Sequence, residues 1–116
     1  MAGSLFHSRE FRADTYLASN GTQHHEVVPV DGNRDVMSYS SWTETKQFGA
    51  TLGIPDDAWP DFTDFECAID IPLDAIAPAS EQLRAALVGI ERSSAWPHWF
   101  ARIVAHLDAG KHVFFC

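Results

Sequence analysis

The order of apolar and polar residues predicts β-structure in the N-terminal third of the chain. Mixed runs at residues 9–19, 22–30 and 34–39 are separated by Asn20-Gly21 and by Asp31-Gly32-Asn33. Asn-Gly favours a tight hairpin because both of its positions tolerate positive φ. We therefore expect a three-stranded antiparallel meander, with Pro29 at an edge or a strand end because proline has no N–H to donate.

A helix is predicted after the meander. Ser41-Trp42-Thr43-Glu44 fits a capping box, in which the serine hydroxyl and the glutamate side chain satisfy each other's backbone N–H groups. Gly53 and Pro55 would end this helix near Leu52. Residues 54–62 contain two prolines and several aspartates, which is typical of a loop.

The clearest strand pattern covers residues 63–71 and continues to Leu73. Alternation with a period of two predicts one face towards the core and the other towards solvent. The apolar face would carry Phe65, Cys67, Ile69, Ile71 and Leu73, and the polar face Asp64, Glu66 and Asp70. Pro72 marks the end of the strand or an edge position.

Helices and a short strand are predicted for the C-terminal part. Apolar residues recur at helical spacing over residues 78–92 and again over 97–109, where Gly110 would close the second helix. Residues 112–115 form a short final strand. The order β-β-β-α-β-α-α-β indicates a single α+β domain spanning residues 1–116, with a mainly antiparallel sheet and helices packed on one face.

Composition and charge narrow the choice of partners. The chain has 116 residues, 46% of them hydrophobic, and a formal net charge of −8. Nucleic acids and anionic membranes would repel such a protein, because their binding relies on positive surface. No apolar run approaches the ~20 residues of a membrane span, and we see no leader segment at the start. Neither of the two cysteines, Cys67 and Cys116, belongs to a close cysteine pair in the sequence, so we expect a cytoplasmic protein with reduced thiols.

Acidic residues are concentrated in one part of the chain. No Lys or Arg occurs between Lys46 and Arg84, and eight acidic residues lie there: Asp56, Asp57, Asp61, Asp64, Glu66, Asp70, Asp74 and Glu81. Trp59 lies among them. A tryptophan with an acidic rim can anchor a basic partner, although Trp59 can equally fold into the core.

Catalytic and metal motifs are not recognisable in the sequence. There is no phosphate loop, nucleophile elbow or EF-hand, and we expect no cofactor and no metal. The six histidines are the main alternative, with His24, His98 and His106 as the strongest candidates for a small enzyme or a ligand- or metal-binding domain. His98, Arg102 and His106 line one polar helix face, where solvation is the simplest expectation, and the two histidines would be about 12 Å apart.

The sequence favours a small, non-enzymatic binding protein that inhibits a basic partner such as a nuclease or another nucleic-acid-binding effector. Its contact residues would be Asp56, Asp57, Trp59, Asp61, Asp64, Glu66 and Asp70. In size, charge and element order the chain is similar to bacterial toxin-immunity proteins and to anti-defence proteins that imitate nucleic acid. A third hypothesis is an oligomeric structural domain, in which protomers pair through the apolar strand Val113-Phe114-Phe115. Under the first two hypotheses we expect a monomer or a homodimer.

Overall fold

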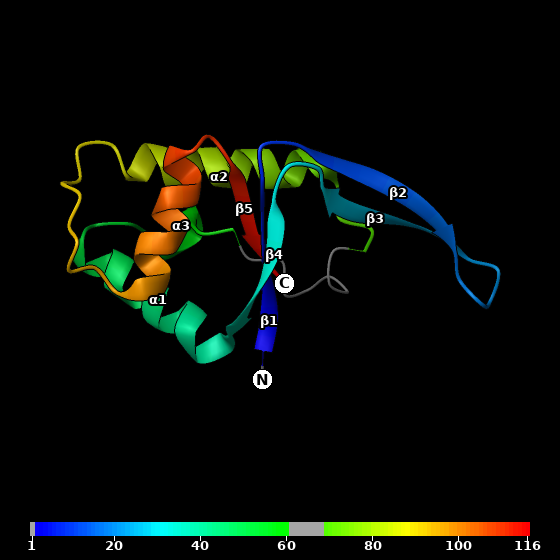
Figure 1. The fold of residues 1–116 in the computed structure, drawn as a ribbon, viewed down its shortest axis with the longest axis horizontal. Helices are drawn as coiled ribbons and strands as arrows, with labels where there is room; N and C mark the ends of the chain where they lie inside the picture. The colour runs from blue at the N-terminus through cyan, green and yellow to red at the C-terminus, as the bar shows by residue number, and fades with distance from the viewer. Residues whose placement is uncertain (1, 61–68) are drawn as a thin grey trace.

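The structure is a computed structural model, and it describes residues 2–60 and 69–116. Figure 1 shows the elements in chain order. They are β1 (Ala2–Ser8), β2 (Phe11–Leu17), β3 (Gln23–Pro29), β4 (Asn33–Ser38), α1 (Tyr39–Thr51), the short 3-10 helix η1 (Asp56–Ala58), α2 (Leu73–Ala86), α3 (His98–Asp108) and β5 (His112–Phe115). The expected α+β class with antiparallel sheets is confirmed.

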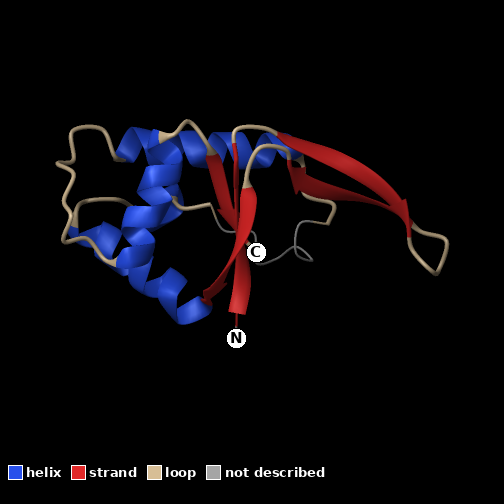
Figure 2. Ribbon diagram, viewed as in Figure 1, coloured by secondary structure: helices blue, strands red, loops and turns tan. Residues whose placement is uncertain are grey.

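The strands form two separate antiparallel sheets. β1 is the central strand of a sheet with the order β4-β1-β5, and β2 pairs with β3. The hairpin expected around Asn20-Gly21 forms, and Figure 2 shows it projecting away from the rest of the molecule. The tight two-residue turn does not, because the ladder already ends at Leu17 and Gln23 and Gly21 has positive φ whereas Asn20 does not. The expected three-stranded meander is wrong in its order, because β4 pairs with β1 instead of β3. β1 itself was not predicted as a strand.

Two hydrophobic clusters lie on opposite faces of the central sheet. Leu5 and Phe115 pack with residues of α1 and α3 on one face. Phe6 and Phe114 pack on the other face with residues of β3 and α2. Successive side chains of a strand point to opposite faces, so the adjacent apolar residues of β1 make it suitable for the centre of the sheet. The helices α1 and α3 cover one face as expected, and α2 contributes to both clusters.

Helix α1 begins earlier than its sequence predicts. The N-cap is Ser38, whose hydroxyl accepts from the backbone N–H of Ser41 at 3.1 Å. Ser41 therefore lies inside the helix, and the expected capping box does not form. The C-terminal signal is confirmed, because Gly53 follows the helix with φ 88°. In the described ranges no helix combines the length and the apolar character that a membrane crossing requires.

The acidic strand expected at residues 63–71 lies mostly outside the described residues. In its described part, Ile69 makes an isolated bridge to Glu26, and Asp70 turns the chain with φ 58°. Ile71 is buried as expected. Leu73, expected in the core, starts α2 and is 41% exposed. Helix α2 begins five residues before Pro78, which the sequence suggested as its start.

The outer edge of β5 is closed by a side chain of α2. The hydroxyl of Ser80 accepts from the N–H of Val113 at 3.1 Å and donates to its C=O at 3.2 Å. Val113 is fully buried, as is Ser80. A backbone edge whose polar groups are already bonded cannot pair with another strand unless those bonds break. Edge-to-edge pairing of Val113, Phe114 and Phe115 between protomers would have to replace these two bonds at Val113, and it stays a prediction.

Candidate functional site

Residues far apart in the sequence form one polar cluster beside the central sheet. His7 of β1, Asp35 of β4 and His106 of α3 each place a nitrogen or oxygen atom within 4.8 Å of the others. Asp35 is the β4 partner of Leu5, and His7 is two residues further along β1. His7 and Asp35 are thus diagonal neighbours on the sheet face that α3 covers.

The contacts inside the cluster are close. The imidazole rings of His7 and His106 are stacked, with centroids 3.8 Å apart and an interplanar angle of 9°. The Oδ2 atom of Asp35 lies 3.3 Å from Nε2 of His7 and 3.9 Å from Nε2 of His106. The side chain of His106 is only 16% exposed. The expectation that His106 belongs to a solvated helix face is therefore wrong.

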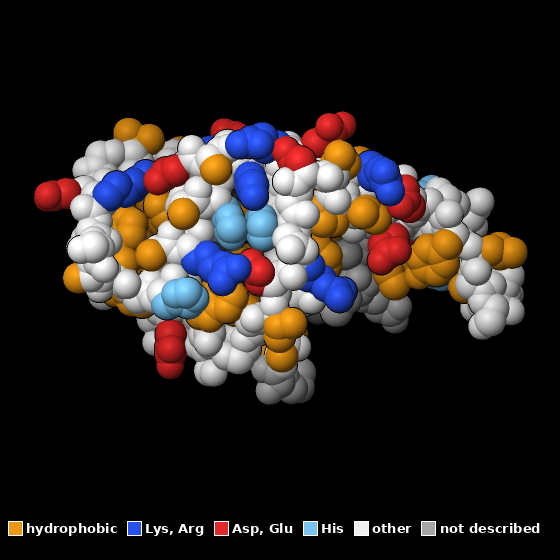
Figure 3. All heavy atoms as spheres, in the orientation of Figure 1, with side chains coloured by type: hydrophobic (Ala, Val, Ile, Leu, Met, Phe, Trp, Pro, Cys, Tyr) orange, Lys and Arg blue, Asp and Glu red, His pale blue; other side chains and the backbone are white. Residues whose placement is uncertain are grey.

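Two cations complete the cluster. Arg102, one turn before His106 on α3, donates from Nη2 to Oδ1 of Asp35 at 3.0 Å. Lys111 follows α3, and its Nζ lies 3.3 Å from Nδ1 of His7. Figure 3 shows histidine side chains near the middle of one face, with Lys or Arg and a carboxylate beside them. We call these five residues, His7, Asp35, Arg102, His106 and Lys111, the histidine cluster.

Both imidazoles of the histidine cluster have lowered pKa values, which favours their neutral forms. Burial is the main cause that lowers the pKa of His106 to about 4; the nearby His7 and Lys111 also lower it, and Asp35 opposes them. Burial is also the main cause that lowers the pKa of His7, followed by Lys111. Two stacked rings would repel each other if both were charged, which agrees with these directions.

The cluster contains polar atoms that lack a partner. Oδ2 of Asp35 and Nε2 of His106 are buried and make no hydrogen bond. The 3.3 Å contact between Oδ2 and His7 is close enough for an ion pair but does not have hydrogen-bond geometry. Leaving a buried polar atom unpaired costs about 1–3 kcal/mol. The two atoms lie 3.9 Å apart, so they are neighbouring polar groups that a bound group with matching polarity could satisfy.

The acidic residues predicted to bind a partner do not form one described surface. Asp61, Asp64 and Glu66 lie outside the described residues. Asp56 and Asp57 are exposed at the start of η1. Asp56 has a basic neighbour in space, because its Oδ1 lies 3.7 Å from Nζ of Lys46.

Two other predicted contact residues are engaged within the chain. Trp59 is only 5% exposed and packs in the core against Trp42 and Phe100, so it cannot fill a partner's pocket here. The carboxylate of Asp70 accepts from the backbone N–H of His25 at 3.2 Å and lies 2.9 Å from Nδ1 of His24. The expectation of an exposed Trp59 anchor is thus corrected, and Asp70 has a structural role in holding β3.

The three histidines singled out in the sequence do not form one site. His24 lies on β3 and contacts Asp70, and its ring packs near Tyr16. His98 is exposed at the start of α3. Only His106 belongs to the histidine cluster. The sequence did place Arg102 and His106 on one helix face, but it gave no signal that His7, Asp35 or Lys111 would join them.

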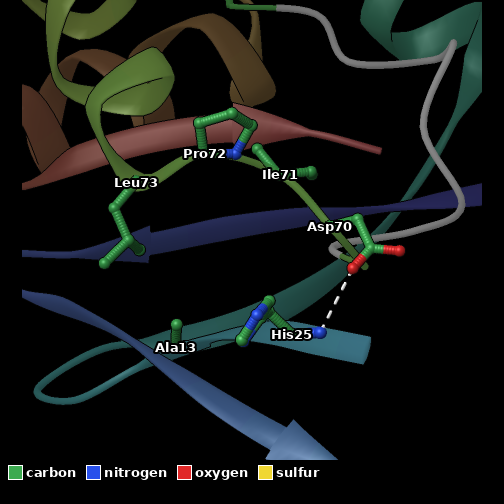
Figure 4. A pocket seen from close by; sticks show the side chains of 6 residues that line it. All are labelled: Ala13, His25, Asp70, Ile71, Pro72 and Leu73. Atoms are coloured by element: carbon green, nitrogen blue, oxygen red, sulfur yellow. Dashed lines mark hydrogen bonds between the residues drawn. The ribbon is translucent and has the colours of Figure 1, made fainter. Parts of the chain in front are cut away.

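A pocket of about 440 Å³ lies between the hairpin and the start of α2. Figure 4 shows its lining: Ala13, His25, Asp70, Ile71, Pro72 and Leu73. The Asp70 carboxylate is already bonded to β3, so it offers less unsatisfied polarity than the histidine cluster.

Comparison of the chain with protein-family models, curated proteins and solved structures finds no match.

Proposed function

We propose that this protein binds a small phosphate monoester at the histidine cluster. The observation that supports this function is the pair of buried, unpartnered atoms, Oδ2 of Asp35 and Nε2 of His106, beside two cations. An ionised carboxylate only accepts hydrogen bonds, so a ligand that supplies a donor suits the acceptor capacity that the Nε2–H of His7, 3.3 Å from Oδ2, leaves open on Asp35. The cations require that the same ligand also carries anionic oxygens. A singly protonated phosphate group has both.

The local charge favours an anion. With both imidazoles neutral, the positive charges of Arg102 and Lys111 exceed the single negative charge of Asp35. This positive site lies in a chain with a net charge of −8. A polyanion such as RNA would meet repulsion from the rest of the surface, whereas a small phosphate ester would experience mainly the local cations.

A metal ion is the less suitable occupant, despite the two histidines and the carboxylate. The ammonium of Lys111 only donates, so Nδ1 of His7 must accept and the ring proton must sit on Nε2. Nε2 is the atom that faces Asp35, and a protonated nitrogen cannot bind a metal. Metal-bound histidines normally donate their second N–H to an acceptor. At Nδ1 of His7 the neighbour is the ammonium of Lys111, which is a donor.

Calorimetric titration with phenyl phosphate tests this proposal. The second pKa of a phosphate ester is about 6, so at about pH 6 much of the ligand carries the proton that Asp35 needs. We expect binding to phenyl phosphate and to inorganic phosphate, and much weaker binding to sulfate, which has no proton to donate. Arg102→Gln should weaken binding about tenfold or more, because it removes a charge-assisted contact.

A matched control exists next to the site. Arg92 pairs with Asp108 at 2.9 Å on the surface, so Arg92→Gln removes a similar arginine–aspartate pair without touching the histidine cluster. Binding in this variant should equal that of the wild type. Equal affinity for sulfate and phosphate, or no effect of Arg102→Gln, would contradict the proposal. Tight binding of Zn²⁺ that is lost in His106→Gln would favour the metal alternative instead.

The acidic binding function remains a second proposal. It is supported by the net charge of −8 and by the exposed Asp56 and Asp57 at the start of η1. A basic nuclease would bind with an affinity that falls as salt is added. Reversing both charges with Asp56→Lys and Asp57→Lys should abolish that binding, while Asp108→Lys should not. Binding that survives the first pair of substitutions would rule out this surface.

A further inference from the structure

The outer edge of strand β2 is an open backbone surface. The hairpin of β2 and β3 projects from the body of the protein (Figures 1 and 2). Residues 12–17 of β2 are all exposed, and Leu17 is 72% exposed. No strand within residues 2–60 or 69–116 pairs with this edge. A hairpin of two strands is only marginally stable by itself, so a further strand would stabilise it.

The outer edges of β5 and β3 are partly covered within the chain, whereas β4, the other edge strand of the central sheet, has no partner strand on its outer side among the described residues. Ser80 covers β5, as described above. The outer side of β3 meets residues 69–70, where the N–H of Asp70 donates to the C=O of His25 at 2.7 Å. β2 lacks such a cover among the described residues, and it differs from β5 in this respect. A ladder of unpaired N–H and C=O groups is a surface that takes another strand.

The hydrogen-bond pattern shows which residues offer the open groups. At the two ends of the hairpin, Val30 donates to the C=O of Glu10 at 2.9 Å and Ala18 donates to the C=O of Thr22 at 2.8 Å. Bonded and non-bonded pairs alternate along an antiparallel ladder. The backbone groups of Arg12, Asp14 and Tyr16 therefore point towards β3. Those of Ala13, Thr15 and their odd-numbered neighbours point outward from the hairpin.

We propose that a second copy of this chain pairs with β2 in an antiparallel arrangement centred on Ala13. In this register Arg12 of each copy lies opposite the partner's Asp14, and Ala13 lies opposite the partner's Ala13. Both charged side chains are on the same face of the strand, form an ion pair with each other at 3.2 Å within one chain and are largely exposed, with relative side-chain exposures of 62% and 50%, so in the dimer they would exchange this pair for two pairs across the interface. The result is a four-stranded antiparallel sheet built from two hairpins.

Charge selects this register over its neighbours. The open backbone groups alternate, so the register can move only in steps that keep the odd-numbered residues bonded. The next step is centred on Asp14 and places two aspartates directly opposite each other. Like charges in that position are destabilising, and opposite charges are stabilising. The pairing of Arg12 with Asp14 is therefore the most favourable of these choices.

The dimer should be weak and dependent on concentration. A single pair of short strands buries less area than a permanent interface, and each copy carries a net charge of −8. Sedimentation velocity over a range of concentrations measures the equilibrium. We expect reversible dimers at high concentration, with affinity falling about tenfold or more in Arg12→Glu, because two attractive pairs become repulsive.

A charge exchange tests the register. Arg12→Glu combined with Asp14→Lys restores opposite charges across the interface, so the double variant should dimerise like the wild type. If Arg12→Glu weakens the dimer and the double variant does not recover, the register is wrong. A wild type that stays monomeric at the highest soluble concentration overturns the proposal.

A proline substitution tests the backbone pairing. Ala13→Pro removes an N–H that points outward, so it leaves the ladder with β3 intact and prolines are tolerated at such edges. Dimerisation should be lost, while circular dichroism stays that of the wild type. Ala13→Thr keeps the N–H and is the matched control. A dimer that persists in Ala13→Pro contradicts pairing through β2. Arg102→Gln should leave the dimer unchanged, because Arg102 contacts Asp35 and the Trp99 ring.

Discussion

Acid should destabilise this protein through His106. The pKa of an unfolded histidine is 6.5, whereas burial beside His7 and Lys111 lowers that of His106 to about 4 in the folded state. Between these values the unfolded chain binds a proton that the folded chain does not. The stability that His106 contributes is therefore complete above about pH 6.5 and is lost as the pH falls towards 4.

The magnitude follows from the shift. A pKa difference of about 2.5 units corresponds to about 3 kcal/mol at 1.36 kcal/mol per unit. The side chain is only 16% exposed, so solvent screening reduces this value little. The lowered pKa of His7 adds to the loss in the same direction. The pKa values of Asp31 and Asp70 are lowered too, but from 3.8, so their contributions are lost mostly below this range.

Urea denaturation at a series of pH values between about 7 and 4 measures the effect. The wild type should lose about 3 kcal/mol more of its free energy of unfolding than His106→Gln, which has no imidazole to titrate. His98→Gln removes an exposed imidazole from the same helix and should keep the wild-type loss. Equal losses in the wild type and in His106→Gln would refute the reasoning. An NMR titration of the His106 ring gives an independent value for its midpoint.

The remaining predictions concern the cation of the cluster and the core. Lys111→Met should raise the pKa values of both clustered imidazoles, because Lys111 lowers them, and NMR titration would show the shift. Ser80→Ala should cost about 2 kcal/mol or more, measured by urea denaturation, because it leaves the buried N–H and C=O of Val113 unpaired; an exposed serine changed to alanine should cost far less. Gly49→Ala would place a Cβ 2.8 Å from the Trp59 ring, and we expect this overpacking, about 1–3 kcal/mol, to exceed the ~1 kcal/mol that alanine gains in a helix. An unchanged or increased stability of Gly49→Ala would show that the ring has room to move.

Much of the local structure could be predicted from the sequence. The Asn20-Gly21 hairpin, the end of α1 at Gly53 and the helix that ends before Gly110 all depend on neighbouring residues, because turn and cap preferences act over a few positions. The strand at His112–Phe115 was also predicted with its observed bounds. The start of α2 was predicted five residues too late. Pro78 was taken as a helix start, but α2 accommodates it within its length.

The candidate site could not be predicted in the same way. His7 and Asp35 are brought together because β4 pairs with β1 across the intervening hairpin, and His106 is brought to them because α3 packs on that sheet face. In the sequence, His106 appeared to face water together with Arg102. Its burial in the folded protein, together with the nearby His7 and Lys111, lowers its pKa.

The sequence alone determined the class of fold, the position of most helices and strands, and the excess of negative charge. Each of these depends on composition or on residues close together in the chain. The tertiary structure decided the strand order, the burial of Trp59 and the positive histidine cluster within an acidic protein. These features depend on contacts between residues that are distant in sequence, and such contacts are selected by the packing of the whole chain.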